Sequence, residues 1–175
     1  MKQTSKALLI ALVILCSFTV VPDRIEWQPN KTLSWDDFKG QPNGRGGFVA
    51  STSSGMSQSY VIAGNGVLNK KETYVKAHFY PEYSWYRAKD TTALLLKHEQ
   101  THFDITEIHA RILNARIQSY NFTSNSKEEV KDLYEQVEKE RRAMQKAFDK
   151  ETNHSIHRDI EKKWEARIAR LLLPL

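Results

Sequence analysis

The sequence predicts an α+β fold, in which a small N-terminal antiparallel sheet packs on three helices. Residues 24–86 contain short apolar runs separated by clusters of Gly, Pro and Asn, a texture that is typical of strands and turns. From residue 91 onward, apolar residues recur every three or four positions, which is the period of amphipathic helices. The 175 residues suit one domain, which we expect to span 20–175.

The segment that precedes this domain, residues 1–19, has the pattern of a secretory signal peptide. Two lysines precede an unbroken run of apolar or small residues over 7–21. The run is shorter than the roughly twenty residues that a bilayer crossing needs, so we expect cleavage near Thr19. A retained N-terminal anchor and a lipoprotein modified at Cys16 are the alternatives. We therefore expect an exported, periplasmic or extracellular protein that meets a membrane only through this segment.

The charge of the chain argues against a nucleic-acid partner. The chain has 26 basic and 21 acidic residues, so its net charge is +5 with histidine neutral. The two signs are interspersed, as in residues 138–142 (EKERR), whereas a nucleic-acid-binding face concentrates basic residues. The chain also has one cysteine, which excludes an intrachain disulfide and a zinc site built from cysteines alone.

Four segments of the N-terminal half are predicted to be strands because they are apolar, rich in β-formers and bounded by turn residues. They are residues 23–27, 48–53, 58–63 and 73–80. The last two flank Gly64-Asn65-Gly66, which is typical of a tight hairpin turn. The sequence therefore predicts a small antiparallel sheet.

The three- and four-residue spacing of apolar residues after residue 91 predicts three helices. The first spans about 91–120, and the second begins at Ser126 after a polar break. Ser126 and Glu129 have the spacing of a capping box at the start of the second helix. The third helix spans about 156–173. Each has an apolar stripe, so we expect all three to contribute to one core.

The first predicted helix contains His98-Glu99-Gln100-Thr101-His102, an HExxH sequence. The two histidines lie about 40° apart around the helix and about 6 Å apart along it, so both imidazoles can reach one cation. Glu99 lies beside that cation, where a carboxylate can accept a proton from an attacking water. We therefore predict one zinc ion per chain, Glu99 as the catalytic base and a zincin-like fold with HExxH on its first long helix.

A catalytic zinc site normally has three protein ligands, so a third ligand must come from elsewhere in the chain. Asp104 and Glu107 lie on the same helix but point away from the two histidines. The candidates farther along the chain are Glu128, Glu129, Asp132, Glu135, Glu138, His154 and His157. We favour His154, because a side chain at the junction of two helices can be aimed inward.

Other residues are candidates for supporting roles. Asp104 and Asp149 each fit an acceptor that orients a ligating imidazole, and each equally fits a structural cap or an ion pair. The strand at 60–63 is a candidate for holding a substrate peptide by strand addition. A donor that stabilises an oxyanion is expected near the zinc, and the candidates are Tyr83, Tyr86, His157 and Arg158.

Three motifs resemble those of a known bacterial family. Residues 33–42 are similar to its Leu-x-Trp-x-Asp-Phe-x-Gly-x-Pro opening, and residues 98–105 contain its HExxH core. Residues 148–154 are similar to its aromatic-Asp-x-x-Thr-x-His-Gly element, with Ser155 where Gly is usual. The family is that of the predicted secreted zinc-dependent proteases of bacteria, long catalogued as a domain of unknown function.

The resemblance implies that His98, His102 and His154 bind zinc and that Glu99 is the general base. We therefore expect a secreted metallopeptidase that hydrolyses peptide bonds in a peptide or protein substrate. One alternative is a zinc-stabilised binding or scaffolding domain of the cell envelope without turnover. Another is a structural envelope protein that binds no metal and in which the HExxH sequence is accidental.

Overall fold

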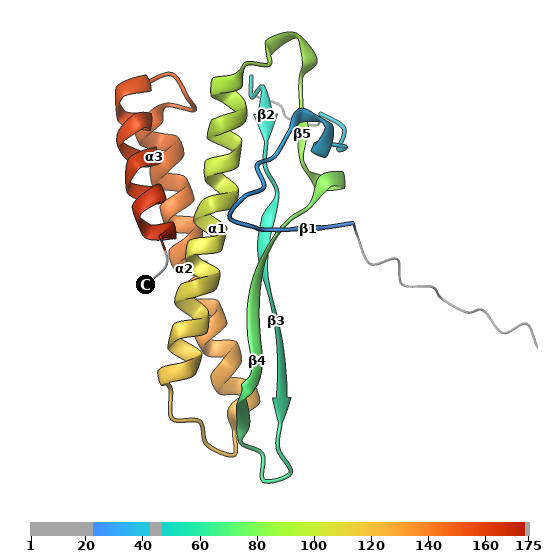
Figure 1. Ribbon diagram of the computed structural model, residues 1–175, viewed down its shortest axis with the longest axis vertical. Helices are drawn as coiled ribbons and strands as arrows, with labels where there is room; N and C mark the ends of the chain where they lie inside the picture. The colour runs from blue at the N-terminus through green and yellow to red at the C-terminus, as the bar shows by residue number, and fades with distance from the viewer. Residues whose placement is uncertain (1–22, 43–46, 174–175) are drawn as a thin grey trace, which may run out of the picture.

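The structure, a computed structural model, describes residues 23–42 and 47–173. It shows a layer of three helices packed against a narrow antiparallel sheet (Figure 1). This confirms the predicted α+β fold. The predicted signal peptide over 1–19 lies outside the described residues. Of the helices described, none is both long enough and apolar enough to span a bilayer.

The strands form two antiparallel sheets. The larger sheet has the order β1-β4-β3, with β1 at Ile25–Glu26, β3 at Ser54–Ile62 and β4 at Leu68–Phe79. The smaller sheet pairs β2 (Ala50–Ser51) with β5 (Trp85–Tyr86). Both small strands lie at one end of the molecule, beyond the end of the long β3–β4 hairpin (Figure 1).

The hairpin turn between β3 and β4 confirms the prediction made from Gly64-Asn65-Gly66. The amide of Ala63 donates to the carbonyl oxygen of Val67 at 2.9 Å and closes the turn. Gly66 has a φ of +82°, and a Cβ atom at this position would lie 2.8 Å from the carbonyl oxygen of Ser124. Glycine is therefore required at Gly66 by both the backbone conformation and the available space.

The predicted strand over 48–53 is longer than the strand found there. Only Ala50–Ser51 pair as β2, because the chain then crosses from the small sheet to the large one. At the crossing, the amide of Ser53 donates to Oγ of Ser84 at 2.9 Å, and β3 begins at the next residue. The sequence analysis did not predict β5, because a strand of two residues has no alternation to detect.

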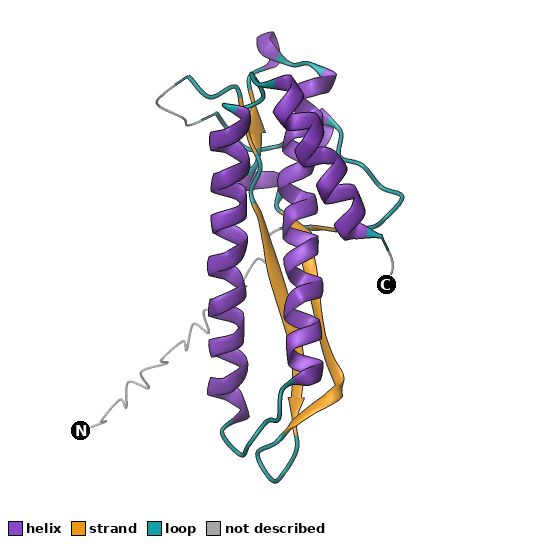
Figure 2. Cartoon of the chain, turned by 90° about the vertical axis from the view of Figure 1, so that its left-hand side faces the viewer, coloured by secondary structure: helices purple, strands orange, loops and turns teal. Residues whose placement is uncertain are grey.

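The helices are α1 (Ala93–Ser119), α2 (Ser126–Thr152) and α3 (Arg158–Leu172), close to their predicted bounds. Figure 2 looks onto the helical layer, with the strands behind it. The central helix is α1, which packs against β3 and β4 on one side and contacts both α2 and α3. The shorter α3 covers only the end of α1 that lies near β2 (Figure 1).

The predicted capping box at the start of α2 is wrong. Ser126 is buried, and its Oγ donates to the carbonyl oxygen of Thr123 at 2.6 Å. The same Oγ accepts a hydrogen bond from the amide of Leu68 at 2.9 Å. Glu129 accepts from the amide of Thr123 at 2.9 Å. Ser126 therefore fixes the α1–α2 loop against β4, a tertiary role that the local pattern does not reveal, while Glu129 holds the loop to the first turn of α2.

The buried apolar residues form two clusters, one on each side of α1. The cluster between the sheet, α1 and α2 includes Ala77, Phe79, Phe103, Leu113, Ile117, Val130 and Val137. The cluster between α1, α2 and α3 consists of Ile105, Ile108, Phe148, Trp164 and Ile168. Because α1 is packed on both sides, the buried side chains of its N-terminal half, among them His98, Glu99 and His102, are closely packed.

A buried guanidinium lies between α1 and α2. Arg141 donates to both carboxylate oxygens of Glu138 at 2.7 Å and to Oγ1 of Thr106 at 3.3 Å. Burial alone would raise the pKa of Glu138, but hydrogen bonds from Arg141 and Arg142 hold this pKa below its ordinary value. The carboxylate is therefore charged in the folded protein and neutralises a cation that water cannot reach.

We predict that Glu138→Gln lowers the free energy of unfolding by about 2 kcal/mol at neutral pH, because it leaves Arg141 buried without its carboxylate. Folding lowers the pKa of Glu138, so its stabilisation is present above the unfolded value of 4.5 and disappears as the pH falls through the folded value. Urea unfolding between neutral pH and about pH 3 should therefore show the two proteins converging.

The matched control for this prediction is Glu135→Gln. The side chain of Glu135 is 64% exposed and lies 3.9 Å from Lys131. Its removal should change the free energy of unfolding by less than about 0.5 kcal/mol. Equal losses in the two variants would contradict the stabilising role of Glu138.

Candidate metal site

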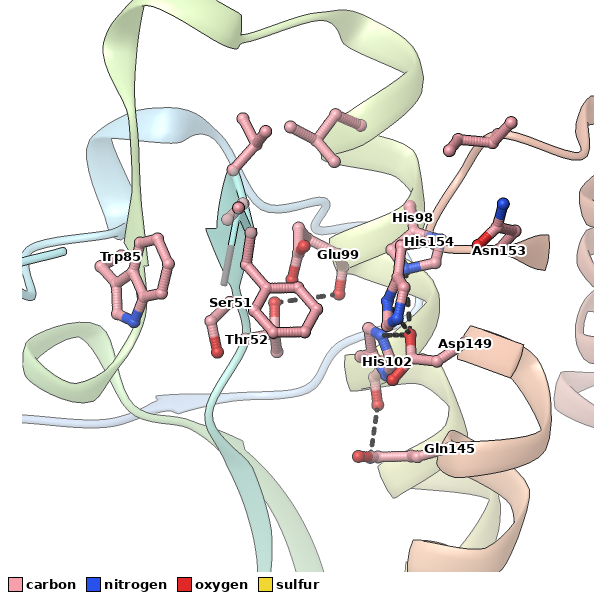
Figure 3. Close-up of a pocket in the computed structure, with 16 residues that line it drawn as sticks. Ser51, Thr52, Trp85, His98, Glu99, His102, Gln145, Asp149, Asn153 and His154 are labelled. Atoms are coloured by element: carbon pink, nitrogen blue, oxygen red, sulfur yellow. Dashed lines mark hydrogen bonds and ion pairs between the residues drawn. The ribbon is translucent and has the colours of Figure 1, made fainter. Parts of the chain in front are cut away.

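The HExxH sequence borders a pocket of about 570 Å³ beside the N-terminal half of α1 (Figure 3). One wall consists of His98, Glu99 and His102, all three buried. The segment 47–52, which includes β2, forms the facing wall, and Asp149 comes from the end of α2. The packing of α1 between the sheet and the other helices thus brings three distant parts of the chain around one cavity.

Three side chains at this pocket form a group that can hold a metal ion. The ligand atoms of His98, His102 and Asp149 all lie within 4.8 Å of one another. Oδ1 of Asp149 is 3.2 Å from Nε2 of His98 and 2.9 Å from Nε2 of His102. Bonds of about 2.0–2.1 Å to a tetrahedral ion place two ligand atoms about 3.3 Å apart. The measured spacings therefore fit ligands of a single ion.

The two imidazoles are held in place by Phe148, which is fully buried. The ring of His98 stacks on Phe148 with a centroid distance of 4.5 Å, and the ring of His102 meets it edge-on at 5.3 Å. Trp164 of α3 packs against the same ring at 5.6 Å. Because Phe148 precedes Asp149, one turn of α2 supplies both the platform for the imidazoles and the carboxylate that faces them.

The electrostatics of the group favour a cation. Burial alone would lower the pKa of His98, but the hydrogen bond with Asp149 and the charges of Glu99 and Glu161 raise it above its ordinary value. Burial alone would raise the pKa of Asp149, yet its hydrogen bonds with His102 and His98 hold that pKa well below its usual range. Three carboxylates thus surround two imidazoles, an arrangement that attracts protons or a metal ion.

Glu99 is a buried carboxylate at the same pocket. Its side chain lines the pocket, is 4% exposed, and has one buried oxygen, Oε2, without a hydrogen-bond partner in the described part of the chain. Its own carbonyl oxygen accepts a hydrogen bond from Oγ1 of Thr52 at 3.2 Å, which ties α1 to the facing wall. A buried carboxylate oxygen left unpaired is costly, so its lack of a partner calls for an explanation.

His154 lines the same pocket but lies outside the three-residue group. Its Nδ1 is 3.7 Å from Oδ1 of Asp149, its ring contacts Phe48 at a centroid distance of 5.0 Å, and its side chain is 50% exposed. Asn153, His154 and Ser155 all have positive φ angles, of 47°, 50° and 73°. This left-handed run returns the chain over the end of α2, with Ser155 in the strained conformation that glycine adopts more easily.

The structure places the other predicted residues away from the metal group. Oδ1 of Asp104 accepts hydrogen bonds from Nε1 of Trp27 and Nε2 of Gln100, both at 2.8 Å, which are structural contacts. The segment 60–63 belongs largely to the far end of β3, next to the hairpin turn. Among the described residues, the pocket is lined by none of Tyr83, Tyr86, His157, Arg158 or the five acidic candidates of α2.

The sequence analysis missed Glu161, a fully buried carboxylate on α3. Its Oε1 lies 3.3 Å from Nδ1 of His98, and its Oε2 accepts a hydrogen bond from Arg158 at 2.7 Å. Helical periodicity contained a signal, because Glu161 precedes the buried residues Trp164 and Ile168 by three and seven positions. Glutamates are usually exposed, so Glu161 was not assigned to the buried face of this helix.

The fold and the pocket define an α+β protein whose longest helices bring together a His, His, Asp group able to hold a metal ion. The family described as "Bacterial protein of unknown function (DUF922)" matches residues 30–155, well over half of the chain. The chain therefore belongs to this family. No curated protein and no solved structure matches the chain. The match includes the whole of α1 and α2 and ends before α3.

We predict that Asp149→Asn lowers the affinity for Zn²⁺ by roughly 100-fold or more, because it removes a charged ligand atom from the group. Competition with a chromophoric chelator measures the affinity. Asp104→Asn is the matched control, since it makes the same change at a carboxylate that bonds Trp27 and Gln100. Wild-type affinity in Asp149→Asn, or equal losses in both variants, would contradict this assignment.

Proposed function

We propose that the protein is a zinc-dependent peptidase in which His98, His102 and Asp149 bind one zinc ion. The observation that carries this proposal is the position of Glu99, which lines the same pocket as His98 and His102 and whose buried Oε2 has no hydrogen-bond partner among the described residues. Histidines four residues apart with a glutamate between them are the arrangement that zinc hydrolases use. The resemblance to predicted secreted zinc-dependent proteases of bacteria supports the same conclusion.

The donor set fits zinc. Imidazole nitrogen and carboxylate oxygen are both zinc ligands, and three protein ligands leave one position for water or substrate. Zinc bound there would polarise a scissile carbonyl group and make a water more acidic. Glu99 accepts the proton of the attacking water and then delivers it to the leaving amine. His154, beside the group on the pocket wall, donates a hydrogen bond to the developing oxyanion.

The pocket suits an extended peptide. Its facing wall consists of residues 47–52, of which Ala50–Ser51 form the strand β2, and its apolar lining includes Phe48, Trp85, Leu95 and Ile156. We propose a peptide or protein with an apolar side chain near the scissile bond as the substrate. The leader pattern supports an exported protein, so the proposed place of action is the periplasm or the exterior of the cell.

A second candidate is a zinc-stabilised scaffolding domain of the cell envelope. The observation in its favour is His154, whose Nδ1 lies 3.7 Å from Oδ1 of Asp149. If His154 bound zinc together with the other three residues, the site would have four protein ligands and be closed, as in structural zinc sites. The sequence-based prediction of His154 as a ligand can thus be tested together with the choice between the two functions.

We predict that Glu99→Gln lowers peptide hydrolysis by about 1,000-fold while zinc stays bound, because the amide keeps the shape of the side chain but cannot accept the proton. Fluorogenic peptide turnover and elemental analysis of the same samples measure the two properties. Glu107→Gln is the control, because Glu107 pairs with Arg111 and lies outside the pocket lining. An equally active Glu99→Gln variant would refute the peptidase mechanism.

We predict that His154→Ala keeps about one zinc ion per chain and lowers turnover roughly 100-fold, because it removes a donor and spares the three ligands. Elemental analysis and the absorption spectrum of the Co²⁺-substituted protein report the ligand set. Loss of zinc in this variant would instead establish His154 as a ligand. Unchanged zinc geometry with unchanged turnover would exclude both roles.

A further inference from the structure

Glu161 is a buried charged group that the proposed reaction does not use directly. Its side chain is 0% exposed, and α3, on which it lies, is outside the residues that the family match covers. A carboxylate is kept in such a place only where partners compensate for the lost hydration. The two partners of Glu161 are the guanidinium of Arg158 and the imidazole of His98.

The ring of His98 lies between two carboxylates. Its Nδ1 is 3.3 Å from Oε1 of Glu161, and its Nε2 is 3.2 Å from Oδ1 of Asp149. A neutral imidazole carries one proton, and only the nitrogen without that proton can bind a metal ion. The two carboxylates therefore compete for one N–H group, and the outcome decides whether Nε2 can act as a ligand.

We propose that Glu161 is a positioning residue, whose carboxylate accepts the Nδ1–H of His98 and so leaves Nε2 free to bind a metal ion beside His102 and Asp149. This inference rests on the metal site of the proposed function. It adds that a residue of α3 fixes the tautomer of His98, the first histidine of the HExxH sequence.

Three observations favour Glu161 over Asp149 in this competition: its deeper burial, the sharing of the Asp149 oxygen with His102, and its contact with Arg158. Glu161 is completely buried, whereas the side chain of Asp149 is 31% exposed and shares its Oδ1 with His102. A charged acceptor in dry surroundings forms the stronger hydrogen bond. Arg158 donates a hydrogen bond of 2.7 Å to the second oxygen of Glu161, so the carboxyl group has a cationic partner on the side away from His98. Stacking on Phe148 fixes the plane of the His98 ring, so each nitrogen keeps its own acceptor.

The direct test is the tautomer of His98 in the metal-free protein, at a pH at which the ring is neutral. Long-range ¹H–¹⁵N spectra of protein labelled at histidine distinguish the two tautomers. The wild type should show the proton on Nδ1, and Glu161→Gln should move it toward Nε2, because a neutral amide is the weaker acceptor. Zinc affinity of the same variant should fall 10- to 100-fold.

The matched control is Glu165→Gln, one turn farther along α3. Glu165 pairs with Lys97, the residue before His98, and so ties the same two helices without touching the imidazole. This variant should keep the wild-type tautomer and zinc affinity within about twofold. Equal effects in the two variants, or an unchanged tautomer in Glu161→Gln, would overturn the inference.

A second variant covers the case in which Glu161→Gln does not fold. Arg158→Ala removes the cation from the second oxygen of Glu161 and leaves the contact with His98 in place. It should shift the tautomer in the same direction by a smaller amount, and no shift would overturn the inference. Failure of the wild type to bind zinc would refute the proposed function, whereas the tautomer comparison would still decide the role of Glu161.

Discussion

The convergence of two imidazoles of α1 on one carboxylate oxygen of α2 is the contact on which the candidate site depends. Nε2 of His98 and Nε2 of His102 both lie within 3.2 Å of Oδ1 of Asp149, although 47 residues or more separate them in the chain. The contact requires α1 and α2 to be packed at a fixed distance. The buried ring of Phe148 on α2 contributes to this packing, because it contacts the rings of both His98 and His102 on α1. The fold can be understood as the support for this contact, since α1 is held by the sheet on one side and by two helices on the other.

The charges at the site explain why so many supporting contacts are present. Three carboxylates, from Glu99, Asp149 and Glu161, lie around two buried imidazoles, and repulsion between buried like charges would destabilise the folded chain without compensation. Arg158 donates a hydrogen bond to Glu161, and Nε2 of each histidine lies within 3.2 Å of Oδ1 of Asp149. Glu99 lines the pocket that residues 47–52 close from the other side, and its buried Oε2 has no hydrogen-bond partner among the described residues. The carboxylate without a protein partner thus belongs to the helix wall of the pocket.

The helical half of the fold was predicted well because its signals are local. The period of the apolar residues gave all three helices nearly their observed bounds, and the glycines of 64–66 gave the hairpin turn. The strands were predicted less well, since the split between β2 and β3 at Ser53 depends on a hydrogen bond to Ser84, 31 residues away. The capping box at Ser126 failed for the same reason, because its side chain bonds β4 and the preceding loop.

By itself, the sequence determined the pair of histidines and the glutamate between them, because residues one turn apart on a helix share a face whatever surrounds that helix. It favoured His154 as the third ligand and gave Asp149 only a supporting role, since the positions of both depend on a left-handed turn and on how α2 meets α1. It gave no role to Glu161, whose contact with His98 spans 63 residues. Tertiary packing alone decided these features, because the distance between side chains on different helices is set by the axes and rotations of both helices and not by either local pattern.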